Sequence, residues 1–366
     1  MGANMQTKIS LVTGGAGFIG SHVVDHLIKM KHKVIVLDDL SGGFRENVNF
    51  KSIFVKGSVV DENILDKIFQ QHKVSYIYHL AAYAAEGLSH FIRRFNYENN
   101  LIGSINLINR AIKFKVKHFV FTSSIAVYGR NQLPMLETLA PKPEDPYGIA
   151  KYAIELDLRT VAEMFGLNHT IFRSHNVYGE RQNHGDPYRN VLGIFVNNIM
   201  SGKPMTVFGD GRQTRAFTHI DDVAPYIAKS VDINGARNET FNIGADKPYT
   251  ILHLARTIAK AMQREPQIEF LPARNEVAHA YSSHEKARGY LASIRQLGWM
   301  KVLIEWWIGR LKLVPENPES LVRLKLWKRC RQAGQKYCNN ETPQISWRKI
   351  YDSNCNSRLF GVWKDS

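Results

Sequence analysis

A phenol and an ammonium group stand four residues apart at Tyr147 and Lys151, a spacing that places both on one face of a helix. A free tyrosine has a pKa of about 10, so it can act as a base near neutral pH only beside cationic groups. Lys151 can supply such a charge. Tyrosine and lysine at this spacing are also a common surface pair. The pair therefore predicts a proton-transfer site only if other reactive groups meet it.

Three hydroxyl side chains, at Thr122-Ser123-Ser124, end an apolar run at residues 118–122 that is typical of a strand. Pro146 stands just ahead of the tyrosine and fits the start of a helix. The carboxyl ends of parallel strands meet at one edge of a sheet, so this run should arrive beside the glycine-rich turn at residues 14–20. The sequence thus predicts that the hydroxyl run and the tyrosine-lysine pair meet near that turn.

The glycine-rich turn reads TGGAGFIG over residues 13–20 and has glycines at 14, 17 and 20. It lies between a predicted strand at 8–13 and a predicted helix at 21–30, so its backbone can approach a pyrophosphate at the start of the helix. Asp38, at the end of the next strand, stands where a carboxylate binds the adenine ribose hydroxyls, which favours NAD over NADP. Asp39 is an alternative for that role.

Apolar runs alternate with helical stretches through the first half of the chain, which predicts an α/β fold with a Rossmann-type, doubly wound parallel sheet. Beyond Arg173 the pattern becomes irregular, with helices expected at 191–200 and 251–262, and this predicts a smaller C-terminal substrate-binding domain. The expected strands are residues 8–13, 33–37, 52–55, 75–80, 118–122 and 169–172. The expected domains are 1–175 for NAD binding, with returning segments around 216–245, then 176–299 for the substrate, and an atypical basic tail at 300–366.

Composition restricts the class of protein but does not choose a ligand. The 366 residues carry a formal charge of +15, which suits nucleic acid, an anionic membrane surface or a phosphorylated substrate equally. No run approaches the roughly 20 apolar residues of a membrane span, and the polar start lacks an apolar signal region, which predicts a cytoplasmic protein without a membrane partner.

The three cysteines all fall in the tail without metal-ligand spacing, so no metal site is expected. The tail lacks periodicity, which favours non-native or poorly ordered sequence over a dedicated module.

From Lys8 to Trp299 the chain resembles the extended short-chain dehydrogenase/reductase superfamily, in particular the NAD-dependent epimerase/dehydratase family and its UDP-glucose (UDP-galactose) 4-epimerase group. The resemblance implies that Tyr147 is the catalytic base, that Lys151 holds the nicotinamide ribose and lowers the tyrosine pKa, and that Ser124 hydrogen-bonds the sugar hydroxyl. The motifs that carry it are TGGAGFIG, His79-Leu80-Ala81-Ala82, Asn99, Thr122-Ser123-Ser124 with Val127-Tyr128-Gly129, the Tyr147-Lys151 pair, and Asn176-Val177-Tyr178-Gly179.

The same resemblance implies contacts to NAD and to a UDP-sugar, and a homodimer. Two arginines suit a diphosphate, because each guanidinium offers a planar fork to its oxygens. The implied cofactor-binding residues are Gly14, Gly17, Phe18, Ile19, Gly20, Asp38, Asp39, Ala81, Asn99, Ser123, Tyr147 and Lys151. The implied substrate-binding residues are Ser124, Tyr147, Asn176, Arg215 and Arg274.

The resemblance implies 4-epimerisation of a UDP-hexose through a transient 4-keto sugar. Related dehydratases carry Asp-Glu in the loop after the hydroxyl run and related decarboxylases carry Glu, whereas this chain has Ser124-Ile125-Ala126. The small Ala280 at the family's gate position favours acceptance of UDP-GlcNAc and UDP-GalNAc beside UDP-glucose and UDP-galactose. Glu86 is expected to disfavour UDP-glucuronate.

Several alternatives stay open. One is another nucleotide-sugar enzyme of the same fold, such as a UDP-uronate epimerase, a decarboxylase or a reductase that releases its cofactor. The other is a non-catalytic Rossmann binding protein, for which RNA is a conceivable but unfavoured partner because Tyr147 and Lys151 are both retained. Gly57-Ser58 replaces the family's Gly-Asp, which predicts weaker adenine binding.

Overall fold

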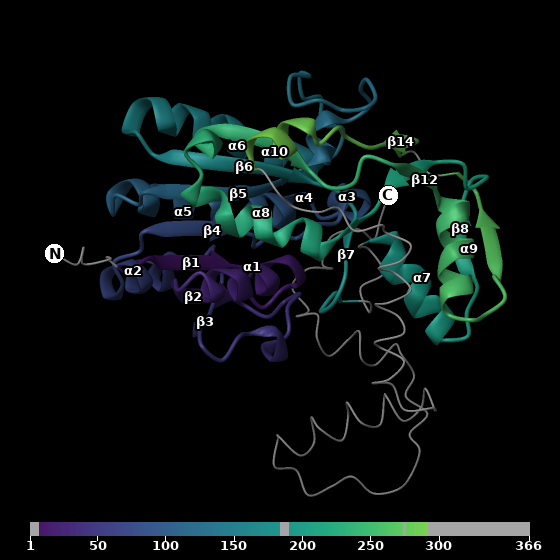
Figure 1. The fold of residues 1–366 in the computed structure, drawn as a ribbon, viewed down its shortest axis with the longest axis horizontal. Helices are drawn as coiled ribbons and strands as arrows, with labels where there is room; N and C mark the ends of the chain where they lie inside the picture. The colour runs from purple at the N-terminus through teal and green to yellow at the C-terminus, as the bar shows by residue number, and fades with distance from the viewer. Residues whose placement is uncertain (1–6, 184–189, 274–275, 292–366) are drawn as a thin grey trace, which may run out of the picture. The chain divides into compact units, whose positions relative to one another are not determined.

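A computed structural model of the chain describes residues 7–183, 190–273 and 276–291 (Figure 1). Its largest element is a seven-stranded parallel sheet in the order β11-β6-β5-β4-β1-β2-β3, which confirms the predicted Rossmann-type fold. The predicted tail at 300–366 lies outside the described residues. The strands are β1 (Ile9–Thr13), β2 (Lys33–Asp38), β3 (Ile53–Lys56), β4 (Tyr76–His79), β5 (His118–Ser124), β6 (Asn168–Ser174) and β11 (Glu239–Ile243).

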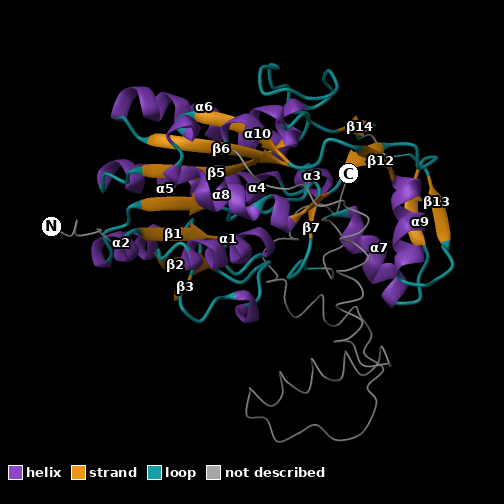
Figure 2. Ribbon diagram, in the orientation of Figure 1, coloured by secondary structure: helices purple, strands orange, loops and turns teal. Residues whose placement is uncertain are grey.

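Helices cover both faces of this sheet (Figure 2). Successive side chains of a strand point to opposite faces, so on β1 Leu11 packs into one core and Val12 into the other. Because both faces are buried, the strands read as continuous apolar runs in the sequence. The apolar core that contains Val12 is covered by α1 (Phe18–Lys29), α8 (Ala224–Lys229) and α10 (Glu285–Tyr290). The core on the other face, which contains Leu11, is covered by α2 (Glu62–Gln71), α5 (Gly103–Lys113) and α6 (Pro146–Phe165).

The strand order reverses beside β1, which pairs with β2 on one side and with β4 on the other. Open α/β sheets bind ligands at the carboxyl ends of the strands where such a reversal occurs. The connection after β4 runs along this edge through α3 (Glu86–Ser89), α4 (Arg93–Tyr97) and a π-helical turn, η2 (Glu98–Ile102), into α5. The fold therefore directs the ends of β1, β2, β4 and β5 to one crevice.

Helix α6 carries the predicted tyrosine-lysine pair. Asp145 caps its start by accepting a hydrogen bond from Gly148 N at 2.9 Å, and Pro146 fills the first turn, where its missing N–H costs nothing. Gly166 ends the helix in the left-handed conformation, with φ of +70°. Although α6 is the longest described helix, neither it nor any other helix of the described residues is long and apolar enough to cross a membrane.

A smaller lobe follows β6 and has its own apolar core, formed around α7 (Val191–Met200) and α9 (Ile251–Ala261). These two helices match the helices expected at 191–200 and 251–262. Short strands, which the sequence pattern did not predict, complete the lobe. They are β7 (Val177–Tyr178) paired with β10 (Thr218–His219), β8 (Met205–Phe208) with β13 (Ile268–Leu271), and β9 (Thr214–Ala216) with β12 (Pro248–Thr250) and β14 (His279–Ala280).

Candidate active site

The glycine turn packs so tightly that it excludes side chains. Gly14 has φ of +72°, and a Cβ there would lie 2.7 Å from Ala81 N. A Cβ on Gly20 would collide with the carbonyl oxygen of Gly14. Gly17 caps α1 without any side-chain hydrogen bond, and Phe18 and Ile19 form the first turn, so the leading N–H groups of the helix have no capping side chain. A bare backbone cradle at a helix N-terminus fits a pyrophosphate.

The side chains of Asp38 and Asp39 point in different directions, which the sequence could not show. Asp38 is buried and turns back to the glycine turn, where its Oδ2 accepts a hydrogen bond from Ala16 N at 3.0 Å and its Oδ1 accepts one from Leu40 N at 2.8 Å. Burial raises the pKa of Asp38, and the backbone hydrogen bonds oppose that rise. Asp39 is exposed and accepts from Ser41 N. Asp38 is thus the carboxylate that faces the cradle.

Two adjacent asparagines on η2, Asn99 and Asn100, have different hydrogen-bond partners. Asn99, the residue singled out from the sequence, donates to the carbonyl oxygen of Phe95 one turn earlier at 3.0 Å. The buried Asn100 accepts from Tyr83 N at 2.9 Å and donates to Tyr83 O at 3.1 Å, and so it fixes the loop after β4. The same loop is tied to β1, because Ala81 N donates to Thr13 Oγ1 at 3.3 Å. Asn100 is a residue that sequence reasoning missed.

Tyr147 and Lys151 lie together at the start of α6, where both side chains are buried, with 6% and 2% of their surface exposed. Lys151 Nζ donates to the carbonyl oxygen of Thr122 at 2.8 Å and lies 5.8 Å from the centre of the Tyr147 ring. Burial lowers the pKa of Lys151 to about 7, and the Glu155 carboxylate opposes this shift. The pair therefore meets the end of β5, as the sequence predicts, and is no surface pair.

The two serines at the end of β5 have different partners. Ser124 Oγ accepts a hydrogen bond from Ala126 N at 3.1 Å and so caps the short turn that follows β5. Ser123 Oγ donates to Glu155 Oε1 at 2.5 Å, so the Ser123 side chain points into the protein interior. Ser124 is thus the hydroxyl at the end of the strand that caps the following turn, while Ser123 supports α6.

Behind these residues lies a buried ion pair that sequence reasoning missed. Arg173 on β6 donates from Nη2 to Glu155 Oε2 at 2.5 Å and from Nε to Glu155 Oε1 at 3.0 Å. Its Nη1 donates to the Tyr128 hydroxyl at 2.7 Å, which in turn donates to Asn242 Oδ1 at 2.9 Å. The chain of contacts connects α6, β6, β11 and the turn after β5, and it fixes the helix that bears Lys151.

Arg215 on β9 is held mainly by backbone carbonyls. Its Nη2 donates to Val277 O at 2.7 Å and its Nη1 to Ala278 O at 2.9 Å, while Glu276 Oε2 lies 3.8 Å from Nη2. These contacts fix the direction of the guanidinium, and Glu276 is the carboxylate that pairs with it. Arg274, the second predicted diphosphate arginine, lies outside the described residues.

Asn176 lies on a segment next to that of Arg215. His175, just before it, hydrogen-bonds the carbonyl oxygen of Ala216, just after Arg215, at 3.2 Å. Ala280 pairs in register with Arg215 and packs in the small apolar cluster that contains Ile125, the residue after Ser124. Neighbouring segments therefore connect the end of β5, at Ser124, with the predicted diphosphate-binding residues Asn176 and Arg215.

Comparison with known proteins finds relatives that match most of this chain. The sequence profile of the NAD dependent epimerase/dehydratase family matches residues 10–244. A putative UDP-glucose 4-epimerase of Methanocaldococcus jannaschii is 35% identical over 81% of this chain and 97% of its own length. A UDP-N-acetyl-alpha-D-glucosaminuronate decarboxylase of Bacillus cytotoxicus is 29% identical over 82% and 94%. The crystal structure of a UDP-glucose 4-epimerase from Thermotoga maritima with UDP-glucose superposes with a TM-score of 0.78 at 35% identity, covering 83% of this chain and 99% of that one.

Proposed function

Because this chain belongs to the NAD dependent epimerase/dehydratase family, we propose that it interconverts a UDP-hexose and its 4-epimer through a transient 4-keto sugar. The observation that carries the proposal is the buried contact of Lys151 with the end of β5, beside Tyr147 and Ser124. UDP-glucose and UDP-galactose are the first candidate substrates, and their N-acetylated counterparts are included because the resemblance puts the small Ala280 at the family's gate position.

NAD is the cofactor of the family, and the glycine turn fits it. The tight backbone leaves no space for a side chain at Gly14 or Gly20, and Asp38 faces the same turn with a carboxylate suited to ribose hydroxyls. Gly14, Gly17, Phe18, Ile19, Gly20, Asp38, Ala81, Asn99, Ser123, Tyr147 and Lys151 are the residues proposed to surround NAD. Bound NAD supplies an acceptor and then a donor for the hydride of the sugar C4.

Tyr147 is the proposed base that removes the proton of the sugar 4-hydroxyl and later returns it. The phenolate needs a nearby positive charge, which Lys151 supplies from the next turn of the helix. The charge of Lys151 is itself sensitive to its surroundings, because burial lowers its pKa to about 7 and Glu155 counteracts that effect. Ser124 is proposed to hydrogen-bond the sugar hydroxyl.

The residues around Ser124 favour epimerisation over the rival reactions. Dehydration and decarboxylation need a further acid or base for the sugar carbons beyond C4. The turn that follows Ser124 supplies the apolar Ile125, Ala126 and Val127, and then Tyr128, whose buried hydroxyl is already bound to Arg173 and Asn242. Asn176, Arg215 and Arg274 are proposed to bind the diphosphate.

We also propose a homodimer, on the basis of apolar side chains on two helices in contact with each other. Phe95 and Ile102 stand seven residues apart on α4 and η2, and each is 45% exposed. Ile149 and Leu156 stand seven residues apart on α6 and are 41% and 45% exposed. We name these four exposed residues the apolar stripe and propose that a second copy of the chain covers them.

The deciding experiment follows the products by NMR. The protein is incubated with catalytic NAD and, separately, with UDP-glucose, UDP-galactose, UDP-GlcNAc or UDP-glucuronate. Conversion of one sugar to its 4-epimer without net NADH supports the proposal and identifies the substrate. Formation of a 4,6-dehydrated or decarboxylated sugar would replace it with a rival reaction. Binding of NAD with no turnover of any sugar would favour the non-catalytic alternative.

A further inference from the structure

The loops that lead into four strands of the large sheet carry positive charges without negative ones. Residues 29–33, 49–52, 70–75 and 112–117 lead into β2, β3, β4 and β5, and together they hold eight lysines and no aspartate or glutamate. All eight lysines are exposed. We name them the lysine edge: Lys29, Lys31, Lys33, Lys51, Lys73, Lys113, Lys115 and Lys117.

The lysine edge follows the amino ends of the strands, at the left end of the sheet in Figure 1. Backbone hydrogen bonds hold its loops side by side. Lys33 N donates to Lys8 O at 2.9 Å. On the other side of β1, Ser75 N donates to Ile9 O at 2.8 Å, and Ser75 O accepts from Lys117 N at 2.9 Å. Five neighbouring strands, β5-β4-β1-β2-β3, at a spacing of about 4.8 Å make this row about 20 Å long.

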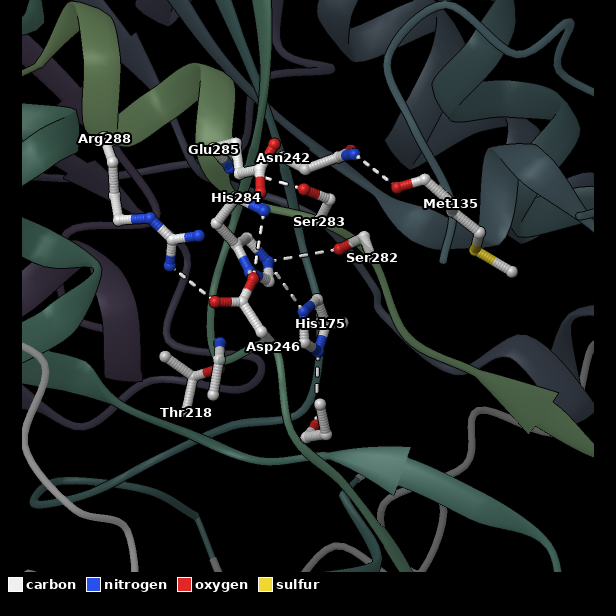
Figure 3. A network of polar contacts seen from close by, with 12 residues as sticks. Met135, His175, Thr218, Asn242, Asp246, Ser282, Ser283, His284, Glu285 and Arg288 are labelled. Carbon is white, nitrogen blue, oxygen red and sulfur yellow. Dashed lines mark hydrogen bonds and ion pairs between the residues drawn. The ribbon is translucent and has the colours of Figure 1, made fainter. Parts of the chain in front are cut away.

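The charges of the lysine edge are not balanced by carboxylates of the described residues. Lys8, in the same row, binds Asp232 at 2.5 Å, but none of the eight lysines forms an ion pair within the described ranges. Beyond the carboxyl end of β11, by contrast, Asp246 contacts both His284 and Arg288 (Figure 3). Like charges in one row repel each other, so a partner with negative charges would relieve this repulsion.

Two of these lysines occupy positions that favour glycine. Lys31 and Lys115 follow α1 and α5 with φ of +64° and +53°, in the left-handed region. Each closes the last turn of its helix through a backbone hydrogen bond, at 3.0 and 3.1 Å. Glycine is the usual residue at such a position because a Cβ is disfavoured there, and α6 ends on Gly166. The chain therefore places charge at this edge at a cost in backbone strain.

Helix dipoles account for only part of the lysine edge. Lys29 and Lys113 lie in the last turns of α1 and α5, where a positive charge stabilises the helix. Helix α2 has no basic residue in its last turn, yet Lys73 follows it. Lys33 and Lys117 lie at the starts of β2 and β5. The row is thus more than a set of helix ends.

Large apolar side chains are exposed at both ends of the row. Phe50 precedes β3 and is 90% exposed. Met164 and Phe165 precede β6 and are 71% and 63% exposed. Asn168 Nδ2 donates to Lys117 O at 3.4 Å, which places their loop next to the lysine edge. Exposed aromatic rings beside lysines suit a lipid surface, because rings enter the interface while ammonium groups stay among the headgroups.

We propose that the lysine edge, with Phe50 and Phe165 at its ends, docks this protein on an anionic lipid bilayer. The active-site crevice lies at the opposite ends of the strands, so a docked protein keeps it open to substrate. Single-stranded nucleic acid would also attract lysines, but it needs aromatic rings among them for base stacking. The expectation of no membrane partner rested on the lack of a spanning segment and a signal region, and a surface contact needs neither.

The test measures co-sedimentation of the full chain with vesicles of equal parts phosphatidylcholine and phosphatidylserine, and with phosphatidylcholine alone. Wild type should bind the mixed vesicles only, and salt should release it. The variant Lys31→Gly/Lys115→Gly should bind roughly 20- to 30-fold more weakly, at about fivefold per lysine. Because glycine fits both backbone positions, its urea midpoint should rise, which separates weak binding from misfolding.

The matched control is Lys142→Gly/Lys203→Gly, which removes the same charge at exposed positions outside the lysine edge. It should bind the mixed vesicles within about twofold of wild type, because charge away from the contact contributes little. No binding of wild type to the mixed vesicles, equal binding of wild type and Lys31→Gly/Lys115→Gly, or an equal loss in the control would overturn the proposal.

A second variant tests the apolar part of the contact. Phe50→Ser/Phe165→Ser should weaken vesicle binding about tenfold or more and leave its salt dependence unchanged, because the rings contribute burial and not charge. Unchanged binding would contradict the insertion of these rings. Binding of polyuridine that Lys31→Gly/Lys115→Gly weakens, with no binding to vesicles, would overturn the lipid surface in favour of nucleic acid.

Discussion

Glu155 and Arg173 form an ion pair that is almost wholly buried, with 0% and 1% of their side-chain surfaces exposed. Breaking such a pair is costly, because the remaining charge has no partner and little water. Glu155 stands one helical turn beyond Lys151 and also receives the Ser123 hydroxyl at 2.5 Å. The pair therefore connects the stability of the sheet with the charge of the lysine proposed to assist Tyr147.

Replacement of Glu155 by Gln should reduce both stability and activity. The free energy of unfolding should fall by about 3–5 kcal/mol, the usual cost of an orphaned buried charge. Because Glu155 opposes the lowering of the Lys151 pKa, its loss should discharge Lys151 and move the acid limb of kcat/KM to higher pH. Urea denaturation and a pH-rate profile check the two effects. Glu163→Gln, at an exposed position of α6, is the control, and a pH profile unchanged in Glu155→Gln would refute the link.

Exchange of Asp38 for Asn should weaken NAD binding, while Asp39→Asn should not. Asp38 points into the glycine turn and Asp39 into solvent, so only the first can meet the ribose hydroxyls. We expect Asp38→Asn to lose about tenfold in affinity for NAD, the value of one charge-assisted hydrogen bond, and to discriminate less against NADP. Fluorescence titration with both cofactors measures this. A larger loss in Asp39→Asn would show that the assignment is reversed.

Acid should destabilise this protein through its buried histidines. Burial lowers the pKa of His32, His118 and His169 to about 4 and of His79 and His175 to about 3. Their folded-state values lie below the unfolded value of about 6.5, so their contribution is complete above that pH and is lost as pH falls toward about 4. Each histidine can contribute up to about 1.4 kcal/mol per pH unit.

Urea midpoints measured from neutral pH down to about 5 test this expectation. His118→Asn should reduce the pH dependence by about one proton, and His90→Gln, at an exposed position, should leave it unchanged. A stability that stays flat over this range would show that these histidines are not kept neutral by the fold.

Leu156→Glu should convert a dimer into a monomer, because it places a charge in the apolar stripe formed with Phe95, Ile102 and Ile149. Light scattering after size exclusion should give twice the chain mass for wild type and the single mass for the variant. Phe50→Glu, at a 90% exposed residue outside the stripe, should stay dimeric. A monomeric wild type, or a dimeric Leu156→Glu, would argue against this interface.

The sequence predicted the parts of the molecule that local pattern determines. Buried parallel strands are continuous apolar runs, so β1 to β6 were located within two residues at each end. Strands of two residues, such as β7 and β10, have no periodicity of their own and exist only because a partner pairs with them. Their positions could not be predicted from one sequence.

At the site, too, only the features set by local sequence could be predicted. The Tyr147-Lys151 spacing and the glycine turn are local, and so they were visible in the sequence. The direction of Asp38 against Asp39, and the roles of Asn99 and Asn100, depend on which backbone group each side chain meets. The contact of His175 with His284 joins residues 109 positions apart, and no local pattern marks it.

The most direct test of the proposed 4-epimerisation follows the hydrogen on the sugar C4. The UDP-hexose that turns over is prepared with deuterium at C4 and incubated in ordinary water with wild type and with Tyr147→Phe. We expect wild type to form a 4-epimer that retains its deuterium at C4, and the variant to lose about 10²–10⁴-fold in turnover although it still binds NAD. Deuterium lost to water, inversion at another carbon, or full activity without the Tyr147 hydroxyl would contradict it.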